Sequence, residues 1–287
     1  MIVEILGSGG SFTIPKPGCG CIVCKEARKK GIPFSRTGPS VFMHGPNILI
    51  DTPEESKEQL NRGSIKDISG CLYSHWHGDH VLGYRTWWSL NYDFRHVCPN
   101  HRTTPIYLPE QVAIDFRSHL GIWQQLSLLQ EQGMVKLVII KDGDSINVSG
   151  VKITPFQLAE KGIHGFLFTE GSYRVLVVMD DMFQWKPSRE LMGVDLAILP
   201  MGVAEFNPLT DERRMGKKHP VLIDEATFDD TLSVVRRLKA KQVILSHIEE
   251  HDGLSYNDLE VLSERLRNKR LNVKFAFDSM QIRVGHA

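Results

Sequence analysis

The sequence lacks an excess of either charge. Its 287 residues contain 34 Lys and Arg and 34 Asp and Glu. This balance gives no overall field that would favour nucleic acid or an anionic membrane, although a local basic patch is compatible with it. We therefore expect a small-molecule substrate and no membrane partner. Nucleic acid is a less favoured partner that composition does not exclude, and a homodimer is compatible with the sequence.

Long apolar runs are also missing. No stretch approaches the ~20 residues that span a bilayer. The first ten residues lack the charged and then apolar layout of a secretory signal and have instead the pattern of a first strand. These features predict a cytoplasmic protein.

Cysteine is scarce, and its five copies are too few and too unevenly spaced for a disulfide framework. Three of them form a Cys-x-Cys-x-x-Cys loop with Cys19, Cys21 and Cys24. Three thiolates at these offsets can hold one soft metal ion, and Gly20 allows the tight turn. The alternative is a loop of three reduced thiols.

The chain has no Pro/Ser/Gly-rich linker, repeat or low-complexity tract. A chain of 287 residues could form one large domain or two small ones. Without a linker, we expect a single domain over residues 1–287. Residues 92–135 fit the pattern least well, and on the pattern alone they could form an ordinary helical connection.

Short β-rich runs bounded by Gly, Asn, Asp or Pro recur along the chain. The predicted strands are Ile2–Leu6, Ser40–Met43, Asn47–Ile50, Gly70–Tyr73, Lys136–Ile140, Ser145–Val148, Val151–Pro155, Gly165–Thr169, Tyr173–Val178, Leu196–Pro200, Gln242–Ser246 and Val273–Ala276. Amphipathic periodicity predicts helices over Thr227–Lys239 and Tyr256–Asn268. These elements indicate an α/β protein.

The most informative segment holds three histidines and an aspartate within six positions: His75, His77, Asp79 and His80. Imidazole is a common zinc ligand, and a carboxylate in the same loop suits a second ion or a bound water. The preceding residues predict the end of a buried strand, so His75 and His77 face the same way. Asp79 and His80 lie beyond the bend and can face a neighbouring ion. The alternative is a surface loop in which histidines cluster by chance.

This spacing resembles the His-x-His-x-Asp-His signature of the metallo-β-lactamase superfamily. The resemblance implies an αβ/βα four-layer sandwich whose loops carry one or two metal ions. It also implies that residues 92–135, which follow the histidine loop, are a variable segment that shapes the substrate pocket. The three-cysteine loop and Leu6-Gly7-Ser8-Gly9 are similar to the branch that contains the cyclic phosphodiesterase of phosphonate breakdown. More distantly, they resemble the protein of pyrroloquinoline quinone biosynthesis.

The resemblance implies further metal ligands. Asp180, at the end of a buried strand, is the expected bridging carboxylate, and His247 is the expected last histidine. A third histidine is expected near positions 159–160, which hold Ala159 and Glu160 instead. His164 or Glu160 could take its place, or one ion could be weakly held or absent. For the cysteine site we expect His251 as the fourth ligand, with Glu250 as the alternative.

A proton donor is also expected from the resemblance. Related enzymes that process tRNA have a His-Glu-Ala-Thr motif before the last metal histidine, and here Asp224 replaces that histidine. The nearest imidazole is His219, which becomes the predicted general acid. With four nearby cations it could form an anion-binding loop or simply a solvated one. These cations are Arg213, Arg214, Lys217 and Lys218.

The predicted function is a metal-dependent hydrolase of a small cyclic or nucleotide-like phosphodiester. Two catalytic zinc ions, with manganese as an alternative, and one structural zinc are expected, and Asp79 would also orient the attacking hydroxide. One alternative acts on a lactone or thioester, or oxidatively like the quinone-biosynthesis relative. Another is a binding protein with a degenerate site.

Overall fold

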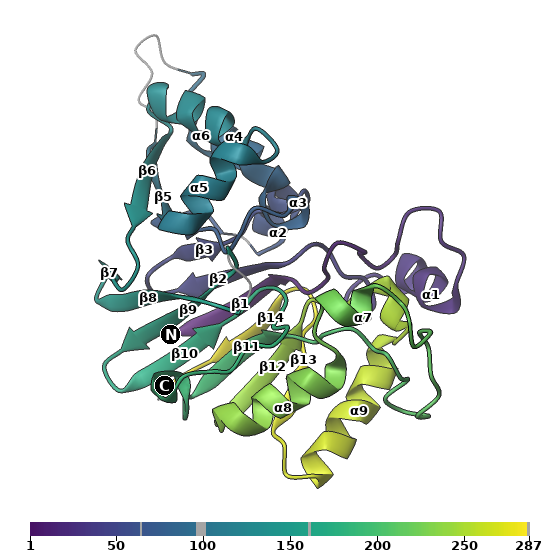
Figure 1. Cartoon of the computed structure of the whole chain (residues 1–287). Helices are drawn as coiled ribbons and strands as arrows, with labels where there is room; N and C mark the ends of the chain where they lie inside the picture. Colours follow the sequence, from purple (N-terminus) through teal and green to yellow (C-terminus); the bar gives the residue numbers. More distant parts are fainter. Residues whose placement is uncertain (64, 96–101, 160–161, 286–287) are drawn as a thin grey trace.

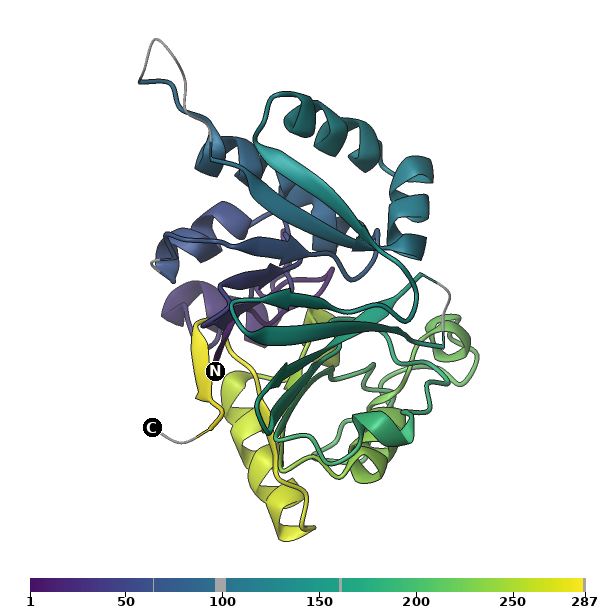
Figure 2. The same ribbon diagram turned by 90° about the vertical axis from the view of Figure 1, so that its left-hand side faces the viewer.

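Two sheets stacked face to face organise the chain in the computed structural model, which describes residues 1–63, 65–95, 102–159 and 162–285. Figures 1 and 2 show helices covering the outer face of each sheet. The architecture is an αβ/βα four-layer sandwich, so the predicted fold class is confirmed.

Each sheet has seven strands in the described part of the chain. The first has the spatial order β14 (Met280–Arg283), β1 (Ile2–Gly7), β2 (Ser40–His44), β3 (Ile48–Ile50), β4 (Gly70–Leu72), β5 (Thr104–Pro109) and β6 (Val135–Ile140). The second has the order β13 (Val273–Phe275), β12 (Gln242–Ser246), β11 (Leu196–Pro200), β10 (Tyr173–Val177), β9 (His164–Glu170), β8 (Val151–Gln157) and β7 (Ile146–Val148).

Helices connect the strands and form the two outer layers. On the first sheet and around its loops these are α1 (Ile22–Lys30), α2 (Ser56–Arg62), α3 (Gly78–Val81), η1 (Leu82–Arg85), α4 (Thr86–Asn91), α5 (Glu110–Ser118) and α6 (Ile122–Glu131). The later part of the chain adds η2 (Arg189–Leu191), α7 (Val221–Asp224), α8 (Phe228–Leu238), η3 (Glu250–Asp252) and α9 (Tyr256–Asn268).

Alternation along the central strands explains the four layers. In β10, Val175 and Val177 belong to the core between the sheets, whereas Leu176 belongs to the core under the helices. Successive side chains of a strand point to opposite faces, so a strand that is apolar at every position must be covered on both. In β3, Leu49 likewise faces the helical side while its two neighbours face the other sheet.

Helices α8 and α9 begin at capping boxes, in which Thr227 and Ser255 accept hydrogen bonds from the backbone N–H groups of Asp230 and Asp258. These caps satisfy backbone donors that a helix start otherwise leaves unpaired. Both helices match their predicted ranges to within one residue at each end. Among the described residues, no helix has the length and apolarity needed to cross a membrane.

The segment 92–135 contributes to the first sheet and its cover. It supplies β5, α5 and α6, and β5 pairs in parallel with β4 and β6. The sequence prediction missed β5, because Pro105 and Pro109 cannot donate to a ladder and obscure the buried positions between them. It also missed the short strand β14. Residues 96–101 lie outside the described part of the chain.

The carboxylate of Asp278 is fully buried and joins three segments near the end of β1. Its Oδ1 accepts hydrogen bonds from the N–H and hydroxyl of Ser8, at 2.9 and 2.8 Å. Its Oδ2 accepts from the N–H and hydroxyl of Thr37 and from Arg62 Nη2, at 3.0, 2.6 and 3.0 Å. Arg36, also buried, donates to the Ser8 hydroxyl at 2.9 Å. This network holds the loop that follows β1.

Replacing Asp278 with Ala should lower the free energy of unfolding by about 3–5 kcal/mol, because it leaves buried donors and Arg62 without their partner. Urea titration measures the change. The matched control is Asp67→Ala, whose exposed carboxylate pairs with Arg102; we expect it to cost less than about 1 kcal/mol. Equal costs for the two variants would contradict this role of Asp278.

Candidate metal centres

The loop after β4 places its three imidazoles and its carboxylate in two groups. His75 and His77 converge with Asp180, and Asp79 and His80 converge with His247. This is the division that the sequence spacing predicts. Asp180 follows β10 and His247 follows β12, so ends of strands from both sheets meet at this point.

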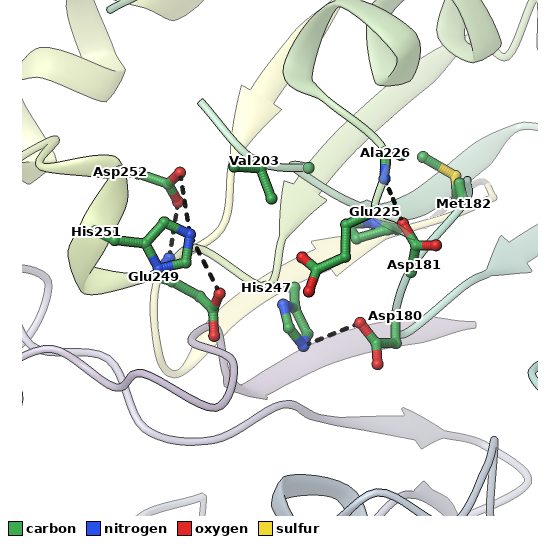
Figure 3. Close-up of a pocket in the computed structure, with 12 residues that line it drawn as sticks. Asp180, Asp181, Met182, Val203, Glu225, Ala226, His247, Glu249, His251 and Asp252 are labelled. Carbon is green, nitrogen blue, oxygen red and sulfur yellow. Dashed lines mark hydrogen bonds and ion pairs between the residues drawn. The ribbon is translucent and has the colours of Figure 1, made fainter. Parts of the chain in front are cut away.

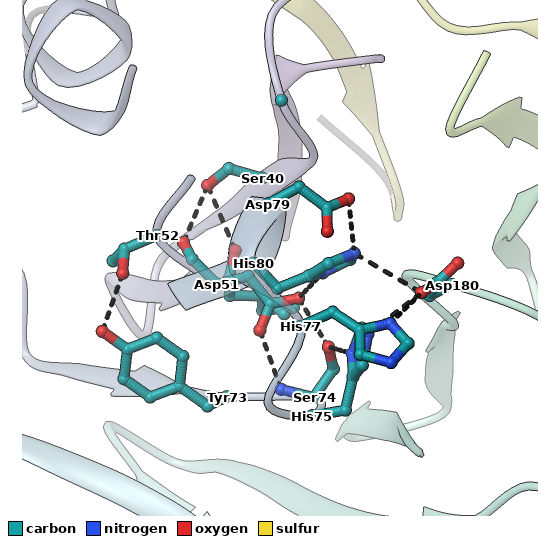
Figure 4. Close-up of polar contacts among 12 residues, drawn as sticks. Ser40, Asp51, Thr52, Tyr73, Ser74, His75, His77, Asp79, His80 and Asp180 are labelled. Carbon is teal, nitrogen blue, oxygen red and sulfur yellow. Dashed lines mark hydrogen bonds and ion pairs between the residues drawn. The ribbon is translucent and has the colours of Figure 1, made fainter. Parts of the chain in front are cut away.

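Asp180 contacts both groups, and Figure 4 shows its carboxylate facing the histidines of the loop after β4. Its Oδ2 is 3.0 Å from His75 Nε2, 3.5 Å from His77 Nδ1 and 3.7 Å from His80 Nε2. Its Oδ1 is 3.4 Å from His247 Nε2. Oδ1 therefore faces the second group, and Oδ2 lies nearest the first group while also approaching His80, so the carboxylate is shared by both groups.

Asp79 completes the second group. Its Oδ2 lies 3.4 Å from His80 Nε2 and 3.6 Å from His247 Nε2. Two imidazoles and a carboxylate oxygen thus point at one small volume.

Unpartnered nitrogens show that these residues fit metal ions. The Nε2 atoms of His75, His80 and His247 are buried without a hydrogen-bond partner among the described residues. They lie close to carboxylate oxygens but lack hydrogen-bond geometry with them. A buried polar atom without a partner is costly, and a cation at each of the two groups would give all three nitrogens a partner.

A buried carboxylate behind the histidines, Asp51, orients two of them (Figure 4). Its Oδ2 is 2.8 Å from His80 Nδ1 and accepts the Ser74 hydroxyl at 2.6 Å. Its Oδ1 accepts the Ser74 N–H at 2.7 Å. The Ser74 hydroxyl also lies 3.0 Å from His75 Nδ1. Such contacts leave the opposite ring nitrogen free for a metal.

The sequence prediction missed Asp51 and Ser74. The sequence did contain a signal for Asp51. It directly follows the apolar run of β3, just as the expected ligand Asp180 follows the apolar run of β10. Its backbone has a φ of 59°, in the left-handed region that Asp tolerates better than most residues.

The carboxylates of both groups are held ionised. Burial by itself would raise the pKa of Asp79, but His80 and His247 outweigh burial and keep it well below its usual range. Burial is likewise outweighed at Asp180 by His247, His75 and His77, so the pKa of Asp180 is also strongly lowered. Ionised carboxylates beside orientable imidazoles are the donor set that zinc and related ions accept.

A cavity of about 310 Å³ opens over this centre. Its lining includes His77, Asp79, Asp180 and His247, and a smaller adjoining cavity is drawn in Figure 3. No lysine or arginine lines either cavity in the described part of the chain, whereas six carboxylates line the larger one. They are Asp79, Asp180, Asp181, Asp224, Glu225 and Glu249.

The three-cysteine loop forms a separate group with Glu250. Glu250 Oε1 lies 3.0 Å from Cys19 Sγ and 3.4 Å from Cys21 Sγ, and Lys16 Nζ is 3.6 Å from Oε2. Cys24 is buried at the start of α1. The contact with Glu250 is the main cause that raises the pKa of Cys19 to about 12 in this arrangement. A cation would replace the thiol proton, so this group also fits a metal.

His251, the expected fourth ligand of the cysteine site, is not part of this group. Its Nε2 lies 3.5 Å from Glu249 Oε2 and 3.9 Å from Asp252 Oδ1, and its ring packs edge-on against Phe12. The tight turn of η3 sends neighbouring side chains in different directions, and Glu250 is the one that faces the thiols. Glu250, the alternative candidate, therefore takes the fourth position beside the three thiols instead of His251.

His164 does not join the main centre either. Its N–H donates to the Ser74 carbonyl at 3.0 Å, so its backbone lies beside the histidine loop. Its Nδ1, however, lies 3.2 Å from the carbonyl oxygen of Gly162. Ile163 lines the cavity, and the next side chain points to the other side. Glu160, the other candidate, lies outside the described residues.

His219 is exposed and does not line the cavity, which corrects its prediction as general acid. Its Nδ1 accepts the Val221 N–H at 3.3 Å. In the nearby cationic loop, Arg213 is paired with Glu205 and stacks on Phe206. Asp224 and Glu225 occupy the cavity wall instead.

Comparison with known proteins identifies the family. A model described as the β-lactamase superfamily domain matches residues 46–248, a range that contains both histidine groups. The chain belongs to the metallo-β-lactamase superfamily. It is 26% identical to a diphosphatase of the PhnP family, with a TM-score of 0.69 over 98% of this chain and 97% of that one. This similarity agrees with the branch that the cysteine loop indicates.

Two further proteins are similar over nearly the whole chain. The zinc-bound protein PqqB of Methylobacterium extorquens has 16% identity and a TM-score of 0.66, over 99% of this chain and 100% of its own. An octanoyltransferase of Porphyromonas gingivalis is 23% identical over 98% of this chain and 52% of its own length. The chain thus spans about half the length of this curated relative. Together, the family match and the diphosphatase support a metal-dependent hydrolase.

Gly10 lies against the imidazole of His247, and replacing it with Ala should weaken metal binding at the second group. An added Cβ would lie 2.3 Å from His247 Cε1 and 2.7 Å from Glu249 Oε1. We expect a loss of about 10–100-fold in affinity, the usual effect of disturbing a ligand's surroundings. Metal titration followed by competition with a chelator measures it. Gly216→Ala, with nothing within 4 Å of its added Cβ, is the control. Equal affinities in the two variants would refute the prediction.

The fourth ligand of the cysteine group can be tested by comparing Glu250→Ala with His251→Ala. We expect Glu250→Ala to lose zinc to a chelator at about 10–100-fold lower chelator concentration, because one ligand is gone. His251→Ala should retain it as the unaltered protein does. The opposite ranking would restore His251 as the ligand.

Proposed function

We propose that the protein is a metal-dependent phosphodiesterase acting on a small cyclic or nucleotide-like phosphodiester. One observation carries the proposal: two groups of ligands share Asp180 at the base of a cavity of about 310 Å³. When bound, two metal ions at these groups supply Lewis acidity towards phosphoryl oxygens and make water more acidic.

The protein residues then have separate tasks. Asp180 keeps the two groups at a fixed separation, since each of its oxygens faces one of them. Asp51 and Ser74 hold His75 and His80 in the ring orientation that exposes Nε2. Asp79 lines the cavity, and its carboxylate can accept a hydrogen bond from the attacking water and orient it.

The charge of the cavity favours a diester over a monoester. Besides the metal ligands Asp79 and Asp180, four acidic side chains line it and, in the described part of the chain, no lysine or arginine does, so no protein cation there would offset a second negative charge on the substrate. A phosphodiester carries one negative charge, and a phosphomonoester carries close to two at neutral pH. The chemistry that suits this wall is therefore cleavage of a singly charged diester. The similarity to a diphosphatase supports a phosphoanhydride diester as a second substrate class at the same centre. Such a diester carries two negative charges, so the cavity wall favours it less than a simple phosphodiester.

The cofactors follow from the donor sets. Imidazole and carboxylate suit zinc, with manganese as the alternative, at the histidine groups, and three thiols with a carboxylate suit one structural zinc. Unpaired thiols at Cys19, Cys21 and Cys24 suit the reducing cytoplasm, where we place the protein.

Replacing Asp79 with Ala should lower turnover of bis(p-nitrophenyl) phosphate by about 10²–10⁴-fold, the contribution of a positioned acid–base group. The fold should persist, and circular dichroism checks this. Asp144→Ala removes an exposed carboxylate outside the cavity and should keep full activity. Retained turnover in Asp79→Ala would contradict the proposed role of Asp79 in hydrolysis.

Metal content and a substrate panel distinguish the rival functions. About two ions at the histidine groups plus one at the thiols support the enzyme, whereas metal at the thiols alone would favour a binding protein. Lactones and thioesters tested beside the phosphodiesters decide between the hydrolytic alternatives. Faster turnover of either would overturn the proposed substrate class.

A further inference from the structure

Glu225 projects into the space above the metal centre. It lines both the larger cavity and the smaller one beside it, which makes it a neighbour of Asp180 and His247 in both. Figure 3 shows its side chain extending from the segment beside Ala226 and ending over His247, with Asp180 close by. A substrate seated on the centre would lie between Glu225 and the ligands.

The backbone around Glu225 is held in place from two sides. Asp181 Oδ1 accepts the Ala226 N–H at 2.7 Å, so the residue next to the bridging ligand fixes this segment. The Val203 N–H donates to the Ala226 carbonyl at 2.9 Å, and the Phe228 N–H donates to the Val203 carbonyl at 3.0 Å. Gly202 permits this approach, because its added Cβ would lie 2.8 Å from the Ala226 oxygen. Glu225 therefore extends from a fixed point.

The Glu225 carboxylate is free to act, in contrast to its neighbours. Glu249 accepts the Phe12 N–H at 2.9 Å and lies beside His251, and Asp181 holds Ala226. Asp79 and Asp180 belong to the metal groups. Within the described residues, the Glu225 side chain has no hydrogen bond or ion pair.

The surroundings also favour the protonated form. The Glu225 side chain keeps exposed surface, but its partial burial against the cavity wall, followed by the charges of Asp180, Glu249 and Asp181, raises its pKa, while His247 opposes this rise. Bound cations lower this pKa and an anionic substrate raises it. Because Glu225 reaches the space where a substrate would sit and has no partner among the described residues, its carboxyl group can serve as an acid there.

We infer that Glu225 is the proton donor to the leaving oxygen, in place of His219 and of the histidine that position 224 lacks. The inference rests on the proposed function. The water oxygen forms a new P–O bond while the old P–O bond breaks, and its electron pair goes to the leaving oxygen. That oxygen takes the proton of Glu225. The proton released by the attacking water passes to solvent, from which Glu225 is reprotonated.

The test is the dependence of rate on the leaving group. Two esters of thymidine 5′-phosphate, the p-nitrophenyl and the phenyl ester, differ in how much their leaving group needs a proton. In Glu225→Gln, kcat for the phenyl ester should fall by about 10²-fold or more, and kcat for the p-nitrophenyl ester by less than about 10-fold. The decline of wild-type phenyl-ester kcat at high pH, where Glu225 is ionised, should disappear in the variant.

Metal content measured by mass spectrometry should be unchanged in Glu225→Gln, which excludes loss of the centre as the cause. Glu264→Gln, at an exposed position of α9, is the matched control and should behave as wild type on both esters.

The outcomes separate the inference from the proposed function. Equal losses on the two esters, an unaffected phenyl-ester rate, or a selective loss in Asp224→Asn instead would each overturn the role of Glu225. A wild-type protein that cleaves the p-nitrophenyl ester but not the phenyl ester has no such donor, and this also overturns it. A metal-loaded wild-type protein that cleaves neither ester refutes the proposed function.

Discussion

The carboxylate of Asp180 is the contact on which the site depends. Its two oxygens face imidazoles from two separate stretches of chain, the loop after β4 and the residue after β12, and three of these imidazoles have unpartnered nitrogens around it. Without a cation, such an arrangement is held only by the surrounding fold. The centre therefore forms only if the strand ends of the two sheets keep their positions relative to each other.

Contacts outside the metal groups hold the ligand-bearing loops in position. Asp51 ties the histidine loop to the end of β3, and Asp278 ties the loop after β1 to the segments around Thr37 and Arg62. Gly10, in that same loop, gives His247 the room it occupies. The metal ligands thus rest on residues that do not touch the metal.

Some of this could be predicted from the sequence. The histidine loop is local, and Asp180 and His247 each end a continuous apolar strand. The end of an apolar run marks the end of a strand in the sequence, and binding sites in α/β proteins form at the carboxyl ends of the strands. The layers were predictable for the same reason, since strands that are apolar at every position require cover on both faces. The prolines hid β5, because they break that pattern locally.

The sequence by itself determined which residue types could bind metal and which strands would carry them. Only the tertiary structure decided which neighbour faces the site, as with Glu250 rather than His251 beside the thiols. The physical reason is that successive side chains in a turn or strand point to different faces. Closeness in sequence therefore does not tell which side chain points into the site. The orientation of these side chains depends on contacts between residues far apart in the sequence, such as the Ala226 N–H with Asp181, which a local sequence pattern does not predict.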